Sequence, residues 1–268
     1  MTDGRSLYLD LMEKVLLNLI YEDPPQDPWS GSVYRPELRA NGMDWPSVAH
    51  SMIGWKRMRN VRVLAEQAIR TGIPGDFIET GVWRGGACIM MRAVLEAYGV
   101  RDRLVYACDS FEGLPPPDIK QFPKEAPNDP HHTFRELKVS LEEVQENFRR
   151  YGLLDGQVRF LRGWFKDTLP SAPIGRIALA RLDGDMYQST MEALTYLYDN
   201  VSIGGHLIID DYGAVEGCRR AVEDFRQEFL IDEPIIPIDR MGVYWMKGAE
   251  RNVRATSQLV REQFHAGT

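Results

Sequence analysis

The chain has 268 residues, of which 44% are hydrophobic and 26% charged, a balance that suits one large domain with a full core and excludes a wholly disordered chain. The formal net charge of −7 argues against a nucleic-acid enzyme, because such enzymes usually present a basic face. No segment approaches 18 consecutive apolar residues, so we expect neither a membrane span nor a membrane partner.

The cysteines and the N-terminal sequence indicate the compartment. Cys88, Cys108 and Cys218 lie in apolar stretches, form no CxxC pair and are odd in number, so we expect buried free thiols. The first twenty residues carry acids and lack the basic start and the cleavage site of a secretory signal. Both observations predict a reducing, cytoplasmic location.

Helices are predicted in the first quarter of the chain. Apolar residues recur at helical spacing over residues 6–20, which predicts a first helix. Residues 21–48 are rich in Pro, Asp, Gly and Trp, and we expect an irregular surface loop there. A second helix is predicted over residues 53–71, because Gly72 and Pro74 mark its end. Residues 1–72 are therefore expected to form a helical cap or lid.

From residue 73 the pattern changes to alternating strands and helices. Strands are predicted at 75–81, 104–109, 158–163, 176–185, 204–212, 234–238 and 242–248, with helices at 84–98, at 140–151 and after residue 212. This alternation predicts a Rossmann-like α/β fold, in which a mostly parallel seven-stranded sheet is covered by helices on both faces. The short link at 239–241 permits only an antiparallel hairpin between the last two strands.

Two segments stand apart from this core of residues 73–248. Residues 111–139 carry many prolines and charges, with His131 and His132 near the centre, and show no clear periodicity. A segment of that length predicts a lid or a substrate loop rather than a plain connection. Residues 249–268 are polar with a weak helical pattern that includes Val253, Leu259, Val260 and Phe264, so we expect a loosely attached tail.

Acidic residues end four of the predicted strands. The first strand ends in Glu79-Thr80-Gly81, the second in Asp109-Ser110, the fourth in Asp183-Gly184-Asp185 and the fifth in Asp210-Asp211. Ligands of open α/β sheets bind at the carboxyl ends of the strands. These acidic groups should therefore face one crevice.

The turn after the first strand indicates which cofactor this crevice binds. The sequence ETGVWRGG is not the GxGxxG of dinucleotide sites, because Trp83 would crowd a pyrophosphate and Glu79 would repel it. An acid there suits a ligand with a positive amine, such as the methionine end of S-adenosylmethionine. Asp109 is placed to accept hydrogen bonds from ribose hydroxyls, which NAD and S-adenosylmethionine both offer. The alternative is that Gly81 and Asp109 are only turn and cap residues.

The four aspartates at the fourth and fifth strand ends predict a metal ion. Carboxylates in one crevice repel each other and shift upward in pKa unless a cation is present. Mg²⁺ is favoured because no His or Cys lies beside the cluster at ligand spacing, and His206 is expected to be a core residue. The alternative is that Asp185 and Asp211 are N-caps of the helices that follow them.

These motifs resemble a known family. The segments ETGVWRGGACIMMRA, ACDSFEG, YGLLDGQVRFLRGWFKDTLP, RLDGDMYQSTM, GGHLIIDDY and DRMGVYW are similar to those of macrocin O-methyltransferases, which methylate deoxysugars of macrolide and aminocoumarin antibiotics. The likeness runs from about residue 6 to 247. It implies a class I methyltransferase that moves a methyl group from S-adenosylmethionine to a sugar hydroxyl of a glycosylated natural product, with Mg²⁺. It also implies a homodimer or higher homo-oligomer, with the N-terminal helix as an interface element.

The resemblance also implies roles for single residues. Asp183, Asp210 and Asp211 would bind Mg²⁺, and Asp185 would be the general base, although related sugar methyltransferases can use a histidine. The residues expected to contact the cofactor are Met52, Ile53, Glu79, Gly81, Asp109 and Ser110, with Trp164 and Phe165 near the adenine. The loop at 115–139 matches the family only loosely, so the identity of the acceptor stays open.

Two other functions are compatible with the same residues. A metal-dependent methyltransferase acting on catechol or phenolic oxygens would need the same aspartates, because adjacent hydroxyls chelate equally well from an aromatic ring. A non-catalytic nucleotide-binding or scaffold module is the second alternative, and the acids at four strand ends argue against it.

Overall fold

The computed structural model describes residues 3–125, 127 and 129–255. Seven strands form one sheet in the order β3-β2-β1-β4-β5-β7-β6. They are β1 (Asp76–Thr80), β2 (Val105–Asp109), β3 (Val158–Arg162), β4 (Ile177–Leu182), β5 (Val201–Ile209), β6 (Ile236–Pro237) and β7 (Val243–Met246). The first five pair in parallel, and β7 pairs antiparallel with both β5 and β6. The Rossmann-like sheet and its closing hairpin are therefore confirmed.

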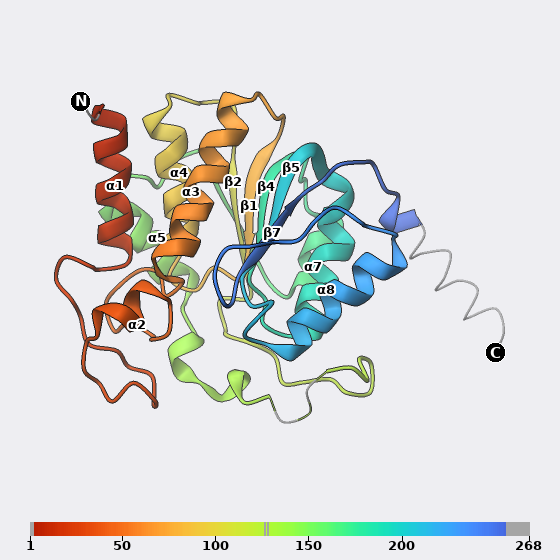
Figure 1. The fold of residues 1–268 in the computed structure, drawn as a ribbon, viewed down its shortest axis with the longest axis horizontal. Helices are drawn as coiled ribbons and strands as arrows, with labels where there is room; N and C mark the ends of the chain where they lie inside the picture. The colour runs from red at the N-terminus through yellow and green to blue at the C-terminus, as the bar shows by residue number, and fades with distance from the viewer. Residues whose placement is uncertain (1–2, 126, 128, 256–268) are drawn as a thin grey trace.

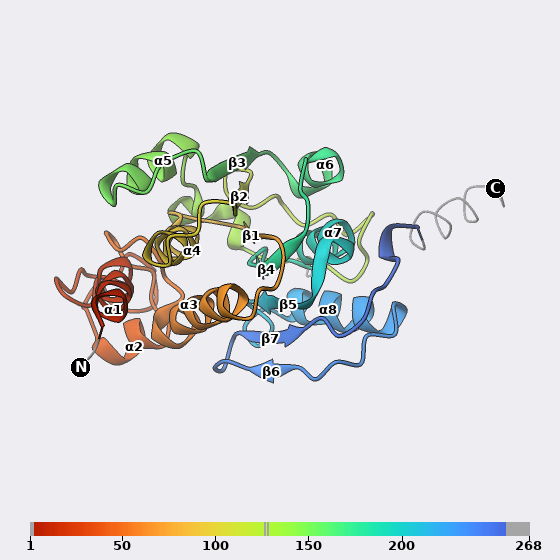
Figure 2. The same ribbon diagram turned by 90° about the horizontal axis from the view of Figure 1, so that it is seen from above.

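Helices cover both faces of the sheet (Figures 1 and 2). The helices are α1 (Gly4–Leu16), α2 (Pro36–Ala40), α3 (Gly54–Arg70), α4 (Gly86–Ala97), α5 (Leu141–Arg150), α6 (Phe165–Thr168), α7 (Tyr187–Leu197) and α8 (Glu216–Glu228), with short 3₁₀ turns at His131–Thr133, Arg135–Leu137, Leu169–Ser171 and Tyr198–Asn200. Helices α3 and α4 pack on one face, with α1 outside them, and α7 and α8 pack on the other.

Successive side chains of β1 point alternately into two hydrophobic cores on opposite faces of the sheet. Phe77 packs with α1, α3 and α4 residues in the first core, and Ile78 packs with α7 and α8 residues in the second. Successive strand residues point to opposite faces, so a strand that is buried on both sides is apolar throughout. This explains why the central strands read as continuous apolar runs.

The N-terminal segment differs from its prediction in two respects. The first helix ends at Leu16 rather than near residue 20, and the expected loop at 21–48 contains the short helix α2. Buried Arg39 on α2 pairs with Asp23 at 2.7 Å and with Asp44 at 2.9 Å. Asp23 in turn accepts hydrogen bonds from the backbone N–H groups of Val48 and Ala49. Buried ion pairs thus hold this segment in one conformation.

The C-terminal residues of the described chain contact the core. Val253 is fully buried in the second core, and its backbone N–H donates to Asp199 at 2.9 Å. The other tail residues that carried the helical pattern, Leu259, Val260 and Phe264, lie outside the described residues. No helix in the described ranges is long and apolar enough to cross a membrane.

The burial of α1 predicts that it is integral to the fold. Leu9 is fully buried, whereas Leu11 on the same helix is 53% exposed. We expect Leu9→Ala to lower the free energy of unfolding by about 2–5 kcal/mol, because it leaves a cavity in the first core. Leu11→Ala is the matched control and should change it by less than about 0.5 kcal/mol. Urea denaturation measures both, and equal small effects would contradict an integral α1.

Candidate functional site

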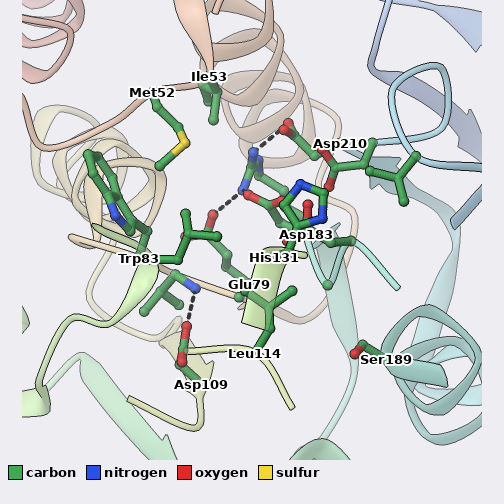
Figure 3. Close-up of a pocket in the computed structure, with 18 of the residues that line it drawn as sticks. Met52, Ile53, Glu79, Trp83, Asp109, Leu114, His131, Asp183, Ser189 and Asp210 are labelled. Carbon is green, nitrogen blue, oxygen red and sulfur yellow. Dashed lines mark hydrogen bonds and ion pairs between the residues drawn. The ribbon is translucent and has the colours of Figure 1, made fainter. Parts of the chain in front are cut away.

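One cavity of about 460 Å³ opens at the carboxyl ends of the parallel strands (Figure 3). This volume is within the range of small-molecule sites. Every residue to which the sequence assigned a role lines it: Met52, Ile53, Glu79, Gly81, Asp109, Ser110, Trp164, Phe165, Asp183, Asp185, Asp210 and Asp211. Strand register explains this convergence, since Thr80 lies beside Leu182, and Leu182 lies beside Ile209.

Gly81 sits where the first strand passes closest to its neighbour. Its φ is +81°, and a Cβ at this position would lie 1.7 Å from the backbone oxygen of Asp183. Only glycine combines that conformation with that approach. The backbone N–H groups of Gly81 and Asp183 donate to Cys108 and Thr80, which continues the ladder past the strand ends.

Asp109 organises the two turns that follow the first and second strands. Its Oδ2 accepts a 2.7 Å hydrogen bond from the N–H of Val82, and its Oδ1 accepts one of 2.7 Å from the N–H of Phe111. Burial raises the pKa of this carboxyl, and the backbone donors oppose the rise. Trp83 and Phe111 both have positive φ, as does Asp185. Such conformations are rare outside glycine and gather at functional sites.

Arg181 connects the acidic residues at the strand ends. It is 1% exposed and forms ion pairs with Glu79, with Asp210 and, at 2.7 Å, with Asp183. Glu79 and Arg181 lie side by side because β1 and β4 pair them in register. The pairs place one guanidinium among three carboxyl groups from three neighbouring strands.

Both carboxyl oxygens of Glu79 have partners within the protein. One oxygen pairs with Arg181, and the other accepts from the backbone N–H of Cys88 at 3.1 Å and from its thiol at 2.9 Å. Burial raises the pKa of Glu79 to about 7, although Arg181 acts in the opposite direction. Glu79 lines the cavity as expected, but the structure adds a cationic partner that the sequence analysis missed.

Asp210 is held by a second arginine. Arg57 of α3 pairs with Asp210 and, at 3.2 Å, with Asp239. Both arginines are buried, at 4% and 1% exposure. One signal for Arg181 is present in the sequence, since it lies two residues before Asp183 and so on the same face of the strand. Arg57 gave none, because it comes from a helix more than 150 residues away along the chain.

The carboxyl groups of Asp183, Asp185 and Asp211 form a compact cluster. Each offers one oxygen, and these oxygens lie within 4.8 Å of one another. Oδ2 of Asp211 is buried without a hydrogen-bond donor among the described residues. Burial and the neighbouring carboxyls raise the pKa of Asp211 well above its usual range, and burial followed by Asp183 raises that of Asp185 to about 7.

This cluster has the properties of a site for a hard divalent cation. All its donors are oxygen atoms, which Mg²⁺ prefers. Five carboxyl groups face two guanidinium groups here, namely Glu79, Asp183, Asp185, Asp210 and Asp211 against Arg57 and Arg181. The excess of acid and the orphaned oxygen of Asp211 fit a missing positive charge.

The helix-cap alternative finds no support. The N-cap of α7 is Met186, and the N-cap of α8 is Val215; neither makes a side-chain cap bond. The N-terminus of α7 is satisfied instead by Glu125, which accepts from the N–H groups of Tyr187 and Gln188 at 3.2 and 3.0 Å. Asp185 and Asp211 are thus free to serve the cavity.

Other predictions from the sequence have clear outcomes. The three cysteines are buried and free, and His206 is 3% exposed on β5. In the loop after β2, His131 lines the cavity, and its Nδ1 lies 2.6 Å from Oδ1 of Asp129. Figure 3 shows His131 projecting into the cavity with Asp183. This loop therefore contributes to the site.

Comparison with known proteins agrees with this geometry. The family model described as macrocin O-methyltransferase (TylF) matches residues 22–247. Demethyldecarbamoylnovobiocin O-methyltransferase of Streptomyces niveus is 52% identical over 245 residues, which are 90% of this chain and 94% of that protein. Mycinamicin III 3''-O-methyltransferase of Micromonospora griseorubida is 48% identical over 250 residues, which are 92% and 98% of the two chains.

A third relative and a solved structure extend the comparison. In Streptomyces olivaceus, 8-demethyl-8-(2,3-dimethoxy-alpha-L-rhamnosyl)-tetracenomycin-C 4'-O-methyltransferase is 52% identical over 256 residues, which are 91% of this chain and 93% of that protein. The structure of the O-methyltransferase NovP superposes with a TM-score of 0.88 at 51% identity, covering 92% of this chain and all of that one.

The close approach at Gly81 predicts a large effect of one added methyl group. Gly81→Ala should lower the free energy of unfolding by about 2–5 kcal/mol and abolish ligand binding, because the Cβ must displace the backbone of Asp183. Gly72→Ala is the matched control, since Gly72 has a similar φ of +68° but no atoms within 4 Å of an added Cβ. It should lower the free energy by only about 1–2 kcal/mol. Equal losses in urea denaturation would contradict the steric argument.

Proposed function

The chain belongs to the macrocin O-methyltransferase family and is an O-methyltransferase, and from this premise we propose that it moves the methyl group of S-adenosylmethionine to a sugar hydroxyl of a glycosylated natural product, with Mg²⁺. The observation that carries the proposal is the cluster of carboxyl groups at the strand ends, with the orphaned oxygen of Asp211, inside the cavity. The cytoplasmic location, the homo-oligomer and its N-terminal interface stay predictions.

The cofactor would occupy the side of the cavity nearest β1 and β2. Gly81 and Asp109, which fixes the turn at Val82, line the cavity there, and Met52 and Ile53 line it as well. Trp164 and Phe165, at the start of α6, add aromatic surface suited to a planar adenine. Ser110 is held by a 2.7 Å hydrogen bond to the carbonyl of Gly113, which orders the turn beside the ribose position.

The cation would be held by Asp183 and Asp211, whose oxygens lie in the cluster, together with Asp210, which lies outside the cluster and is added as a ligand by the family resemblance. When bound, Mg²⁺ supplies Lewis acidity to a sugar hydroxyl, and S-adenosylmethionine supplies the electrophilic methyl group. The arginines Arg57 and Arg181 fix Asp210, and Arg181 also fixes Asp183, so two of the three carboxyl groups are oriented by the fold.

Asp185 would accept the proton of the reacting hydroxyl. It lies two residues after Asp183, its carboxyl faces the same cavity, and no residue of the adjoining helix uses it as a cap. A positioned base of this kind typically contributes about 10²–10⁴-fold to the rate. The remaining residues exclude water and align the oxygen with the methyl group, which contributes through orientation.

The catechol alternative has less support than the sugar. The name of the Streptomyces olivaceus relative gives a rhamnosylated tetracenomycin as substrate and the 4' oxygen as the methylated atom. That relative is 52% identical to this chain over nearly its whole length. A sugar acceptor for this chain is therefore favoured, while the particular sugar and hydroxyl are not assigned.

The proposal is tested by methyl transfer from S-adenosylmethionine to a panel of glycosides and catechols. We expect turnover of at least one glycoside and none of the catechols, measured by mass spectrometry of the acceptor. Methylation of catechols alone would contradict the sugar assignment, and turnover of no acceptor by protein that binds S-adenosylhomocysteine would contradict the proposed substrate class.

Removal of the metal should abolish activity. Exhaustive dialysis against EDTA should reduce turnover to background, and Mg²⁺ should restore it, because the carboxyl cluster loses its counter-charge. Asp211→Asn should raise the Mg²⁺ concentration needed for half-maximal activity by at least about tenfold. Asp199→Asn is a control, because Asp199 accepts from the backbone N–H of Val253 and does not line the cavity. Full activity after chelation would show that turnover does not need a metal ion.

The role of Asp185 can be separated from that of a ligand. Asp185→Asn should lower kcat by about 10²-fold or more and leave the Mg²⁺ activation constant close to wild type, because a base acts in the transition state. Asparagine also tolerates the positive φ of 56° at this position, so the backbone should be preserved. A matched rise in the activation constant would instead make Asp185 a metal ligand, and an unchanged kcat would end the general-base assignment.

A further inference from the structure

The cavity has apolar residues at its entrance as well as acids at its base. Trp29, Met43 and Trp45 come from the segment at 21–48 and line the same cavity as the carboxyl cluster. Trp29 is 56% exposed and Met43 is 39% exposed, whereas Glu79 and Asp210 are almost fully buried. The cavity is thus charged where it is deep and apolar where it meets solvent.

Trp29 and Trp45, which line the cavity, form an aromatic cluster with Phe134, which packs against them but does not line the cavity. Trp29 and Trp45 lie 4.8 Å apart between ring centroids, and Trp45 lies 5.1 Å from Phe134, both pairs edge to face. Phe134 belongs to the loop after β2 and directly follows the 3₁₀ turn His131–Thr133. The aromatic cluster, Trp29, Trp45 and Phe134, therefore joins two segments that are far apart in the chain, since Phe134 comes 89 residues after Trp45 and 105 residues after Trp29.

The positions of the tryptophans are fixed by a buried carboxylate. Asp27 is 3% exposed and accepts hydrogen bonds from the N–H groups of Ser30 at 2.7 Å, of Trp29 at 3.1 Å and of Trp45 at 2.9 Å. The indole N–H of Trp29 donates to the carbonyl of Met43 at 3.4 Å. The fold thus holds Trp29 in place while leaving more than half of it in contact with solvent. Such an arrangement is preorganised for a ligand.

We propose that the aromatic cluster is a subsite for a planar aromatic aglycone of the acceptor glycoside. The inference rests on the proposed function, which brings a sugar hydroxyl to the carboxyl cluster. A glycoside bound in that way must extend its aglycone from the deep, charged part of the cavity toward the entrance. Trp29 makes T-shaped contacts with Trp45 and, at 6.4 Å, with Phe134, and its 56% exposure leaves ring surface available for stacking on a flat ring.

Two glycosides that differ only in the aglycone test this inference. Calorimetry would measure the binding of 4-nitrophenyl α-L-rhamnopyranoside and of methyl α-L-rhamnopyranoside to protein saturated with S-adenosylhomocysteine and Mg²⁺. We expect the wild-type protein to bind the aryl glycoside roughly three- to tenfold more tightly, as one aromatic contact allows. Trp29→Ala should remove most of that preference, and Trp29→Phe should keep most of it.

The controls separate this role from other roles of Trp29. Tyr21→Ala removes an exposed aromatic ring, 85% accessible, that does not line the cavity, and should leave the preference unchanged. An unchanged preference in Trp29→Ala would overturn the inference. So would a loss of S-adenosylhomocysteine affinity in that variant, which would assign Trp29 to the cofactor.

The outcome for the wild-type protein distinguishes this inference from the function on which it rests. Equal affinity for the two glycosides would overturn the aglycone subsite alone. Binding of S-adenosylhomocysteine but of neither rhamnoside would overturn the subsite, whereas the sugar assignment would fail only if no glycoside of the panel were methylated.

Discussion

Arg181 lies at the point on which the whole site depends. It is buried next to the last residue of β4, and its guanidinium pairs with carboxyl groups that come from β1, from the end of β4 and from the end of β5. A buried charge of this kind is tolerated only when its partners are present, and removing one partner typically costs about 3–5 kcal/mol. The acidic strand ends and the arginine therefore require each other. The same ion pairs fix the direction in which Asp183 and Asp210 point. The contacts that neutralise the buried charge of Arg181 therefore also orient the carboxyl groups of the site.

Two irregular segments, at 21–48 and after β2, contribute residues to the lining of the cavity. The segment at 21–48 is ordered by buried ion pairs of Arg39 and by the hydrogen bonds of Asp27, rather than by regular secondary structure. Two contacts hold the loop after β2 in place. Glu125 of this loop accepts a hydrogen bond from the N–H of Tyr187 at the start of α7, and the indole N–H of Trp83 donates to the carbonyl of Glu136. Irregular chain held on a rigid sheet is where recognition surfaces usually vary. The part of the cavity nearest β1 and β2, in contrast, is formed by strand ends and glycine turns.

The sheet, and the convergence of the acidic residues at one of its edges, could be predicted from the sequence. Apolar runs that end in Glu79, Asp109, Asp183 and Asp210 are enough, because parallel strands bring their carboxyl ends to one edge. The burial of Arg57 and the helix α2 could not be predicted from the sequence, since a buried arginine is recognised only through partners that are distant in the chain. Glu79 shows the same limit, because its pairing with Arg181 depends on strand register. The family likeness supplied the role of each aspartate, and neither periodicity nor spacing could have done so.

The central claim is that the carboxyl cluster at the strand ends holds one divalent cation. Electron paramagnetic resonance of Mn²⁺ added to metal-free protein measures this directly, because bound Mn²⁺ loses the sharp signal of the free ion. We expect one Mn²⁺ bound per chain, released by excess Mg²⁺, with binding weakened at least about tenfold in Asp183→Asn. Free Mn²⁺ signal at every protein concentration, or equal binding by the Asp183→Asn variant, would contradict the account.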